Sequence, residues 1–406
     1  MTEKLYLDDA YIVSFRAQVV STAPTGQGGG TVVLDRSGFF PESGGQTSDQ
    51  GSIGPLRVVD VQETADGSVQ HVVEGSLASA GVASGDTIEC CVDWRRRFDH
   101  MQQHTGQHVL SRAFIATSRL DTVSFHMGEE SCTIDLVGEG INDEAVSRAE
   151  DLANAIVTEN RPVRVRTVPV DELDGLGLRR SVPEGVTNAR LVEVEGFDVI
   201  PCCGTHVRQT GELGVIKVVK GEKVRGTQRV YFKVGGRAFG DFRAKHDILQ
   251  ALSARLTTSV GDVPAKVEKL VAEGQQSRKD IKRLSQKLAA LEAAALAAAA
   301  RELGTYRLIA HFFSEGDDGY LRLVSAELRN QPRTVVILGG GDGGVVCGAA
   351  DGVAVDFTQA VVVPARAAGG SGGGKGTFAQ LKLPQGVDVR AFIEEAAHRV
   401  QRSLES

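Results

Sequence analysis

The stretch His104-Thr-Gly-Gln-His108 lies inside a run, from about Phe98 to Thr117, whose apolar residues recur at helical spacing. Side chains four positions apart share one face of a helix, so this run presents two imidazoles a single turn apart. The residue after His104 is Thr105, whereas zinc proteases place a Glu there as general base. The run therefore predicts a ligand-bearing helix of a different kind, against which the neighbouring strands pack.

A second stretch, Cys202-Cys-Gly-Thr-His206, follows an apolar strand pattern that ends at Pro201. Its turn supplies a thiol and a third imidazole to complement the pair on the helix. Such soft-to-borderline donors favour zinc over magnesium or calcium. We predict one Zn²⁺ per chain, with the ligands His104, His108, Cys202 and His206.

Length and composition indicate a globular chain of two or three domains, since it has 406 residues of which 41% are hydrophobic. The net charge of −7 argues against bulk attraction to nucleic acid but leaves room for a local basic patch. No apolar run approaches about eighteen residues and the start lacks a signal-peptide pattern, so we expect a cytoplasmic protein with no membrane partner. The six cysteines, four of them in two adjacent pairs, indicate reduced thiols and metal binding rather than disulfides.

Residues 1–95 alternate apolar and polar positions in short segments separated by turn residues, which predicts a β-barrel-like N-terminal subdomain. A glycine-rich connection, Leu34–Gln46, lies between its second and third predicted strands. The adjacent Gly44 and Gly45 would let the backbone approach a ligand closely, but spacing alone favours an ordinary hairpin connection.

Residues 96–240 predict an α+β core, in which a helix is set against antiparallel strands. Beyond the ligand-bearing helix we expect a strand pair at 123–126 and 132–136. A helix follows from Asn142, a natural N-cap, to about Asn160. Further strands are predicted at 163–168 and 189–195.

Residues 241–303 are rich in Ala, Lys, Glu, Gln and Leu, with leucines mostly three or four positions apart and interruptions at Gly261 and Pro264. This pattern predicts a helical hairpin or coiled-coil arm. Residues 304–406 predict a C-terminal α/β domain. Its expected strands are 306–313, 334–338, 344–349 and 360–363, and its expected helices are about 319–330 and 388–404.

Two glycine patterns in the C-terminal domain are similar to nucleotide-binding loops. Gly339–Gly344 fits G-x-G-x-x-G, but a strand follows it instead of a helix, so a hairpin turn is expected. Gly369–Thr377 nearly fits a P-loop but has Gly376 where magnesium requires Ser or Thr, so we exclude an NTPase. We expect a flexible surface loop here, whose Lys375 and nearby Arg366 offer positive charge to phosphate.

Together these motifs give residues 1–240 a resemblance to the editing domain of alanyl-tRNA synthetases. The resemblance rests on the two ligand stretches, on Leu34-Asp-Arg-Ser-Gly-Phe-Phe-Pro-Glu-Ser-Gly-Gly-Gln46, and on Arg208–Gly214 and Gly226–Phe232. The segment Thr122–Leu136 looks like the free-standing AlaX-type editing proteins. The family implies zinc-dependent hydrolysis, in trans, of tRNA(Ala) mischarged with serine or glycine.

By position, the resemblance implies that the four predicted ligands bind zinc and that Ser37 and Gln46 lie at the catalytic pocket, to which residue type adds Gly44 and Gly45. Ser37 stands where the family usually has a Thr, which keeps a hydroxyl but loses a methyl group. The two glycines offer N–H groups to a developing oxyanion. Cys203 replaces the family's usual Gly after the ligand Cys, so Cys203 stays open as an alternative ligand to Cys202.

Residues 304–406 resemble the C-terminal domain of alanyl-tRNA synthetases, which contacts the tRNA elbow. The resemblance implies that this domain binds tRNA, and the positive charge of Arg366 and Lys375 makes them the candidate contacts. A homodimer through the arm and this domain is also compatible with the sequence. A non-catalytic, zinc-stabilised tRNA-binding or chaperone-like module also stays open, because a metal can be kept for folding alone. The starting Met1, with no activation domain before it, favours a free-standing protein over a synthetase fragment.

Overall fold

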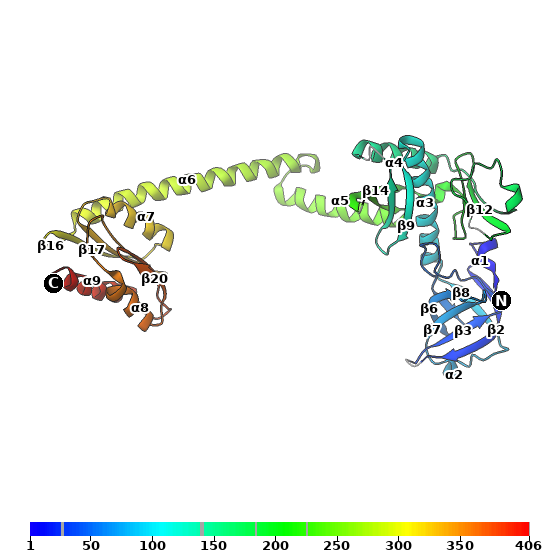
Figure 1. Ribbon diagram of the computed structural model, residues 1–406, viewed down its shortest axis with the longest axis horizontal. Coiled ribbons are helices and arrows are strands. Elements are labelled where there is room, and N and C mark those ends of the chain that lie inside the picture. The colour runs from blue at the N-terminus through cyan, green and yellow to red at the C-terminus, as the bar shows by residue number, and fades with distance from the viewer. Residues whose placement is uncertain (26–27, 139–141, 183–184, 225, 406) are drawn as a thin grey trace. The chain divides into compact units, whose positions relative to one another are not determined.

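The structure is a computed structural model that describes residues 1–25, 28–138, 142–182, 185–224 and 226–405 (Figure 1). It divides into two compact units, Met1–Ala251 and Leu252–Ser406. The first unit contains the two stretches predicted to bind metal, and the second contains the long helix and the C-terminal sheet. Within the described ranges, no helix combines the length and the apolarity needed to cross a membrane.

A closed six-stranded barrel begins the first unit, with the strand order β2-β3-β7-β6-β5-β8. The strands are β2 (Ser14–Pro24), β3 (Gly30–Leu34), β5 (Gly51–Ile53), β6 (Leu56–Glu63), β7 (Val69–Glu74) and β8 (Thr87–Val92). Every second side chain points inward, as Val32 and Leu34 do in β3, and these residues fill the interior. The predicted barrel-like subdomain is confirmed.

Short elements accompany the barrel. They are β1 (Glu3–Lys4), α1 (Leu5–Asp8), β4 (Arg36–Ser37) and α2 (Leu77–Ala80). The strands β1 and β4 pair in parallel, so the N-terminus is held against the beginning of the glycine-rich connection.

Helix α3 (Trp94–Ser118) follows the barrel directly and contains the predicted ligand-bearing run. Asp93 caps its first turn by accepting a hydrogen bond from the Arg96 N–H. Arg97, fully buried, forms an ion pair with the buried Asp49 and so ties the helix to the barrel. A Cβ on Gly106 would lie 2.5 Å from Val234, so glycine permits the close packing of α3 on the neighbouring sheet.

Two further sheets and one helix complete the core around α3. The four-stranded sheet has the order β14-β15-β10-β9 and the three-stranded sheet the order β11-β12-β13. Their elements are β9 (Asp121–Met127), β10 (Cys132–Val137), α4 (Asp143–Thr158), β11 (Val163–Pro169), η1 (Val170–Glu172), β12 (Asn188–Val194), β13 (Asp198–Pro201), η2 (Thr210–Leu213), β14 (Ile216–Val224) and β15 (Thr227–Val234). The predicted strand pair β9–β10 and the Asn142 cap of α4 are both present. The expected α+β core is therefore confirmed.

The predicted arm is helical. It consists of α5 (Gly236–Leu256), a short turn η3 (Val260–Asp262) and the 36-residue α6 (Val263–Ala298). The break falls at the predicted Gly261 and Pro264, and Pro264 occupies the first turn of α6, where its missing N–H costs no hydrogen bond.

The C-terminal domain is a six-stranded mixed sheet with helices on both faces. The strand order is β16-β17-β18-β19-β21-β20, with one parallel pair, β17–β18. The elements are β16 (Arg301–Leu303), β17 (Tyr306–Phe313), α7 (Asp318–Arg329), β18 (Thr334–Gly340), β19 (Gly344–Ala349), η4 (Thr358–Val362), α8 (Val363–Ala367), β20 (Ser371–Lys375), β21 (Phe378–Lys382) and α9 (Val389–Glu405). Alternate residues of β18 face opposite ways: Val336 and Leu338 join α6 and α7, whereas Val335 and Ile337 join η4 and α9.

Two expectations about this domain are wrong. Residues 360–363 form a helical segment, not a strand, because Phe357 and Val361 pack into the core from one helical face and Pro364 suits the first turn of α8. The stretch Gly369–Thr377 is no flexible loop, since Ser371–Lys375 pairs antiparallel with β21 as an edge strand. The expected hairpin after β18 is confirmed, with β19 antiparallel to it.

Candidate metal centre

The two ligand stretches meet at the middle of α3. His104 and His108 project from one face of the helix, with ring centroids 5.0 Å apart, and both are 4% exposed. The loop after β13 brings Cys202 and His206 to them. Arg190 on β12 shapes that loop, because its Nη1 donates to the carbonyl oxygens of Cys202, at 2.7 Å, and Gly204, at 3.0 Å.

The potential ligand atoms converge. One atom from each of His104, His108, Cys202 and His206 lies within 4.8 Å of the others. The Cys202 Sγ is 3.5 Å from His104 Nε2 and 3.3 Å from His206 Nε2. His108 Nε2 is buried and has no hydrogen-bond partner among the described residues. A buried polar atom of this kind requires a partner, so these residues fit a metal ion.

The structure separates the two adjacent cysteines. Cys202 belongs to the cluster, whereas Cys203 is exposed and contributes no atom to it within the described chain. Both cysteines line the cavity at the cluster, but only the Cys202 sulfur lies with the three imidazoles, so the geometry favours Cys202 as the candidate ligand.

Each imidazole is held through its other nitrogen. His104 Nδ1–H donates to Gln46 Oε1 at 2.8 Å, and His206 Nδ1 lies 3.0 Å from Thr105 Oγ1. His108 Nδ1 lies 3.0 Å from the Arg179 guanidinium. Partners of this kind fix the ring orientation of a metal-binding histidine.

The contact with Arg179 determines which ring nitrogen of His108 carries the proton. A guanidinium only donates, so His108 Nδ1 accepts and the neutral ring carries its proton on Nε2. Holding a metal through Nε2 requires that proton to move to Nδ1, which loosens the Arg179 contact. Arg179 remains anchored meanwhile, because its Nε lies 3.1 Å from both carboxylate oxygens of the buried Asp198.

Burial sets the protonation of the cluster. Loss of water lowers the pKa of His104 to about 3 and holds the pKa values of His108 and His206 well below the usual range. The imidazoles are therefore neutral near pH 7, the state that binds metal. Burial also raises the pKa of Cys202 to about 11, so a metal must displace the thiol proton.

The glycine-rich connection reaches this centre from the barrel. Ser43 and Gln46 pair across a two-residue turn in which Gly44 and Gly45 both have positive φ, 59° and 83°. A Cβ on Gly45 would lie 2.8 Å from the Phe125 carbonyl oxygen, so the turn packs directly on β9. Spacing alone had favoured an ordinary connection, and that interpretation is wrong, because Gln46 bonds the ligand His104.

A small cavity of about 240 Å³ opens at the centre. Its lining includes His104, His108, Cys202, Gly44 and Arg180. The N–H groups of Gly44 and Gly45 have no acceptor within the described residues. Gly44 lines the cavity and Gly45 is not among its lining residues, so the cavity combines the ligand cluster with the free N–H of Gly44.

The structure does not bring Ser37 to this cavity. Its side chain is fully buried in the barrel, where Oγ lies 2.8 Å from His71 Nε2. Arg366 and Lys375 belong to the second unit, where Arg366 Nη2 donates to the Gly372 carbonyl oxygen at 3.3 Å.

Two family descriptions match parts of the chain. "Threonyl and Alanyl tRNA synthetase second additional domain" matches residues 189–231, which carry Cys202 and His206. "tRNA synthetases class II (A)" matches residues 6–96, which contain the barrel.

Alanine–tRNA ligases match nearly the whole chain. The enzyme of Archaeoglobus fulgidus is 31% identical over 418 residues, covering 97% of this chain and 43% of its own length. That of Halorubrum lacusprofundi is 34% identical over 419 residues, covering 100% of this chain and 44% of its own length. That of Pyrococcus furiosus is 30% identical over 414 residues, covering 99% and 44%.

This chain is related to the alanyl-tRNA synthetases. The match runs through both units, and the chain spans less than half the length of these relatives. In the present chain, the segment matched by the second-additional-domain description contains Cys202 and His206, the two residues that a loop contributes to the cluster.

Sequence reasoning missed several residues of the centre. Thr105 lies inside the first ligand stretch, so its role beside His206 could have been inferred from the motif. Arg179 and Phe125 carried no such signal; the Phe125 ring stacks on His104 with centroids 5.5 Å apart. Both reach the cluster from segments that are separate in the sequence.

Proposed function

We propose that this chain hydrolyses the ester bond of tRNA(Ala) mischarged with serine, with glycine as a second candidate amino acid. The chemistry uses one zinc ion held by the four clustered ligands. The observation that supports this most is the cluster of three buried histidines and one cysteine. Hydrogen bonds at Nδ1 already orient the rings of His104 and His206. The relationship to alanine–tRNA ligases favours tRNA(Ala) as substrate.

The bound zinc supplies positive charge that orients the terminal ribose and ester of the substrate. Because four protein donors would hold the ion, it would supply positioning of the substrate rather than activation of a water molecule. The chain's own residues then complete the site. The cavity of about 240 Å³ suits a small aminoacyl group.

Gly44 and Gly45 supply the groups that favour the transition state. Neither N–H has an acceptor within the described residues, and Gly44 lines the cavity beside the ligand cluster, whereas Gly45 packs against β9. Donors held in place before the reaction stabilise an oxyanion without reorganising. Gln46 contributes differently, because its amide is engaged with His104 and Thr205 and so positions a ligand.

Contacts to the rest of the tRNA are proposed for the second unit. Lys375 lies exposed on the edge strand β20 and Arg366 contacts the same strand. Cations beside an exposed strand edge can bind phosphate oxygens.

The test is deacylation of seryl-tRNA(Ala) by the purified protein, with metal content measured on the same samples. We expect about one zinc per chain in the wild type and in Cys203→Ala, and loss of both zinc and hydrolysis in Cys202→Ala. Zinc binding and tRNA binding without any deacylation would instead assign the chain to the non-catalytic tRNA-binding class.

A further inference from the structure

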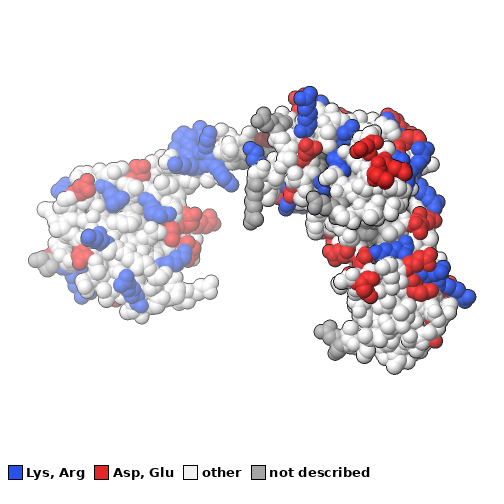
Figure 2. Space-filling view, turned by 45° about the vertical axis from the view of Figure 1, so that its right-hand side comes forward, with Lys and Arg blue, Asp and Glu red and all other residues white. Residues whose placement is uncertain are grey.

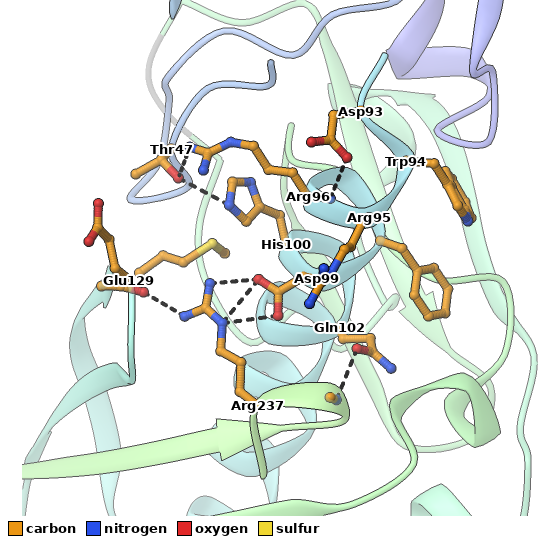
Figure 3. Close-up of a pocket in the computed structure, with 14 residues that line it drawn as sticks. Thr47, Asp93, Trp94, Arg95, Arg96, Asp99, His100, Gln102, Glu129 and Arg237 are labelled. Atoms are coloured by element: carbon orange, nitrogen blue, oxygen red, sulfur yellow. Dashed lines mark hydrogen bonds and ion pairs between the residues drawn. The ribbon is translucent and has the colours of Figure 1, made fainter. Parts of the chain in front are cut away.

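A second cavity lies beside the candidate metal centre and has no role in the function proposed above. It has a volume of about 910 Å³ and is built around the first turns of α3 (Figure 3). His100 lines it and sits four residues before His104, which is about 6 Å along the helix. Thr47 also lines it and directly follows Gln46. The cavity therefore begins next to the metal-binding residues.

We propose that this cavity binds the single-stranded nucleotides that precede the aminoacylated end of the tRNA. This inference rests on the proposed function, since it gives the substrate's 3′ strand a path into the metal centre. Its occupant is recognised by aromatic stacking on bases and by cation contacts to phosphate.

One side of the cavity is aromatic. Trp94 and Phe98 lie one turn apart with ring centroids 5.3 Å apart, and Tyr11 extends the group at 5.2 Å from Trp94. Trp94 and Phe98 are only partly buried, so ring surface stays open to the cavity. Stacking of bases on such side chains contributes about 1–3 kcal/mol per base in single-strand binding proteins.

The cavity wraps around α3, and the residues that line it on the opposite face of the helix are polar. Figure 3 shows Thr47, Arg96 and His100 across α3 from Trp94, with Arg95 and the Asp99–Arg237 pair between them. His100 is 3% exposed, and its buried Nδ1 has no partner among the described residues. A buried, unsatisfied ring nitrogen in the cavity wall indicates a missing hydrogen-bond partner.

Arg95 is free to bind a phosphate, because the neighbouring acids Asp93 and Asp99 are engaged with other groups. Asp99 is committed to Arg237, with a 2.6 Å contact, and Asp93 caps the helix. Arg95 is exposed and has no ion pair or hydrogen bond within the described residues. Among the acids that line the cavity, Glu129 alone has no partner within the described residues, so its charge would repel a bound anion.

The single tryptophan of the chain makes the test direct. Trp94 lies in the cavity, so a stacked base should quench its emission. The full-length protein is titrated with the unacylated tetranucleotide 5′-ACCA-3′. We expect saturable quenching in the wild type and a dissociation constant about tenfold larger in Arg95→Ala. The slope of log affinity against log salt concentration should be smaller by about 0.7 in that variant. Glu129→Gln should bind more tightly.

Arg57→Ala is the matched control, because Arg57 is an exposed arginine on the barrel, paired with Glu74. Absence of quenching, or equal affinity in Arg95→Ala and the wild type, would overturn the inference. The readout does not depend on hydrolysis. Oligonucleotide binding without deacylation would remove only the proposed function, whereas deacylation with Arg95-independent binding would remove only the cavity assignment.

With seryl-tRNA as substrate, Arg95→Ala should raise KM more than it lowers kcat. A contact to nucleotides outside the reacting bond is held equally in the ground and transition states. An effect confined to kcat would contradict a substrate-binding role for the cavity.

Discussion

Gln46 shows how one side chain joins two distant parts of the chain. Its Oε1 accepts from His104 Nδ1–H at 2.8 Å and from the Thr205 N–H at 3.2 Å, and its Nε2 donates to Thr205 Oγ1 at 2.8 Å. The amide therefore fixes a helix ligand and the loop that carries Cys202 and His206. Since all these groups are buried, no water can replace the lost contacts easily.

We expect Gln46→Ala to weaken metal binding by about 10–100-fold, because His104 loses the partner that sets its ring orientation. The measurement is competition with a chromophoric chelator. Gln62→Ala, which removes an exposed glutamine of β6, is the control and should keep the wild-type affinity. Unchanged affinity in Gln46→Ala would show that the ring is held without Gln46.

Inside the barrel, one element depends on a neutral histidine. His71 on β7 is fully buried; its Nδ1–H donates to the Val32 carbonyl oxygen at 2.9 Å, so its Nε2 accepts from the Ser37 hydroxyl at 2.8 Å. Ser37 thus completes a hydrogen-bond chain across β3, β4 and β7. This contact, rather than the amino-acid pocket, explains its burial.

That histidine predicts acid sensitivity. Burial lowers the pKa of His71 from 6.5 to about 4, so below pH 6.5 the unfolded chain takes up a proton that the folded barrel refuses. The contribution of neutral His71 to the free energy of unfolding is fully present above pH 6.5 and is lost as the pH drops toward 4. The shift corresponds to a loss of about 2 kcal/mol between pH 7 and pH 5.

The measurement is urea unfolding of metal-free protein at both pH values, followed by Trp94 emission. His71→Leu should be less stable at pH 7 but should lose about 2 kcal/mol less than the wild type on acidification, since the titrating group is gone. An identical pH response in the two proteins would assign the acid sensitivity to other histidines.

Across the whole molecule, charge is unevenly placed. The chain carries a net charge of −7, yet α6 has seven Lys and Arg against four Asp and Glu, a local charge of +3. Figure 2 shows basic side chains gathered along this helix. α6 also exposes apolar residues at heptad-like spacing, Ile281, Leu284, Leu288 and Leu291. Its surface therefore suits either a polyanion or a second copy of the chain.

Ending the chain after Ala251 should preserve the chemical step and weaken substrate binding. The first unit contains all four clustered residues and Arg237. A cut at Ala251 keeps most of α5, the helix that carries Arg237, whereas a cut at Phe242 would remove most of it. We expect kcat for seryl-tRNA to be retained and KM to rise about tenfold, because remote cation contacts act equally on ground and transition states. Steady-state kinetics of the truncated and full-length proteins provide the comparison.

An unchanged KM in the truncated protein would remove the tRNA-binding role from the second unit. The exposed apolar residues of α6 would then indicate self-association, which light scattering on the full-length and truncated proteins would detect as a difference in mass.

Local periodicity was sufficient to predict many of the elements, but not all of them. Apolar residues at helical spacing located α3, and period-two alternation located the barrel strands β2, β3, β6 and β7 but not β5 and β8. The face that an element buries is visible in its own sequence pattern. The four residues of the candidate metal cluster were also predictable, since spacing four on a helix and a Cys-x-x-x-His turn concentrate donors that seldom occur together. The C-terminal segment 360–363 misled, because a run of β-branched residues also suits a buried helix.

Only tertiary contacts decided what surrounds those ligands. Gln46, Phe125 and Arg179 approach the histidines from three separate segments, and Ser37 turns toward His71 instead of the cavity. The edge position of Ser371–Lys375 likewise depends on its pairing with β21. Spacing along a chain specifies which residues share a face, but the partner of that face depends on packing between elements far apart in sequence. The physical reason is that burial and pairing are satisfied by the whole fold and not by the local run.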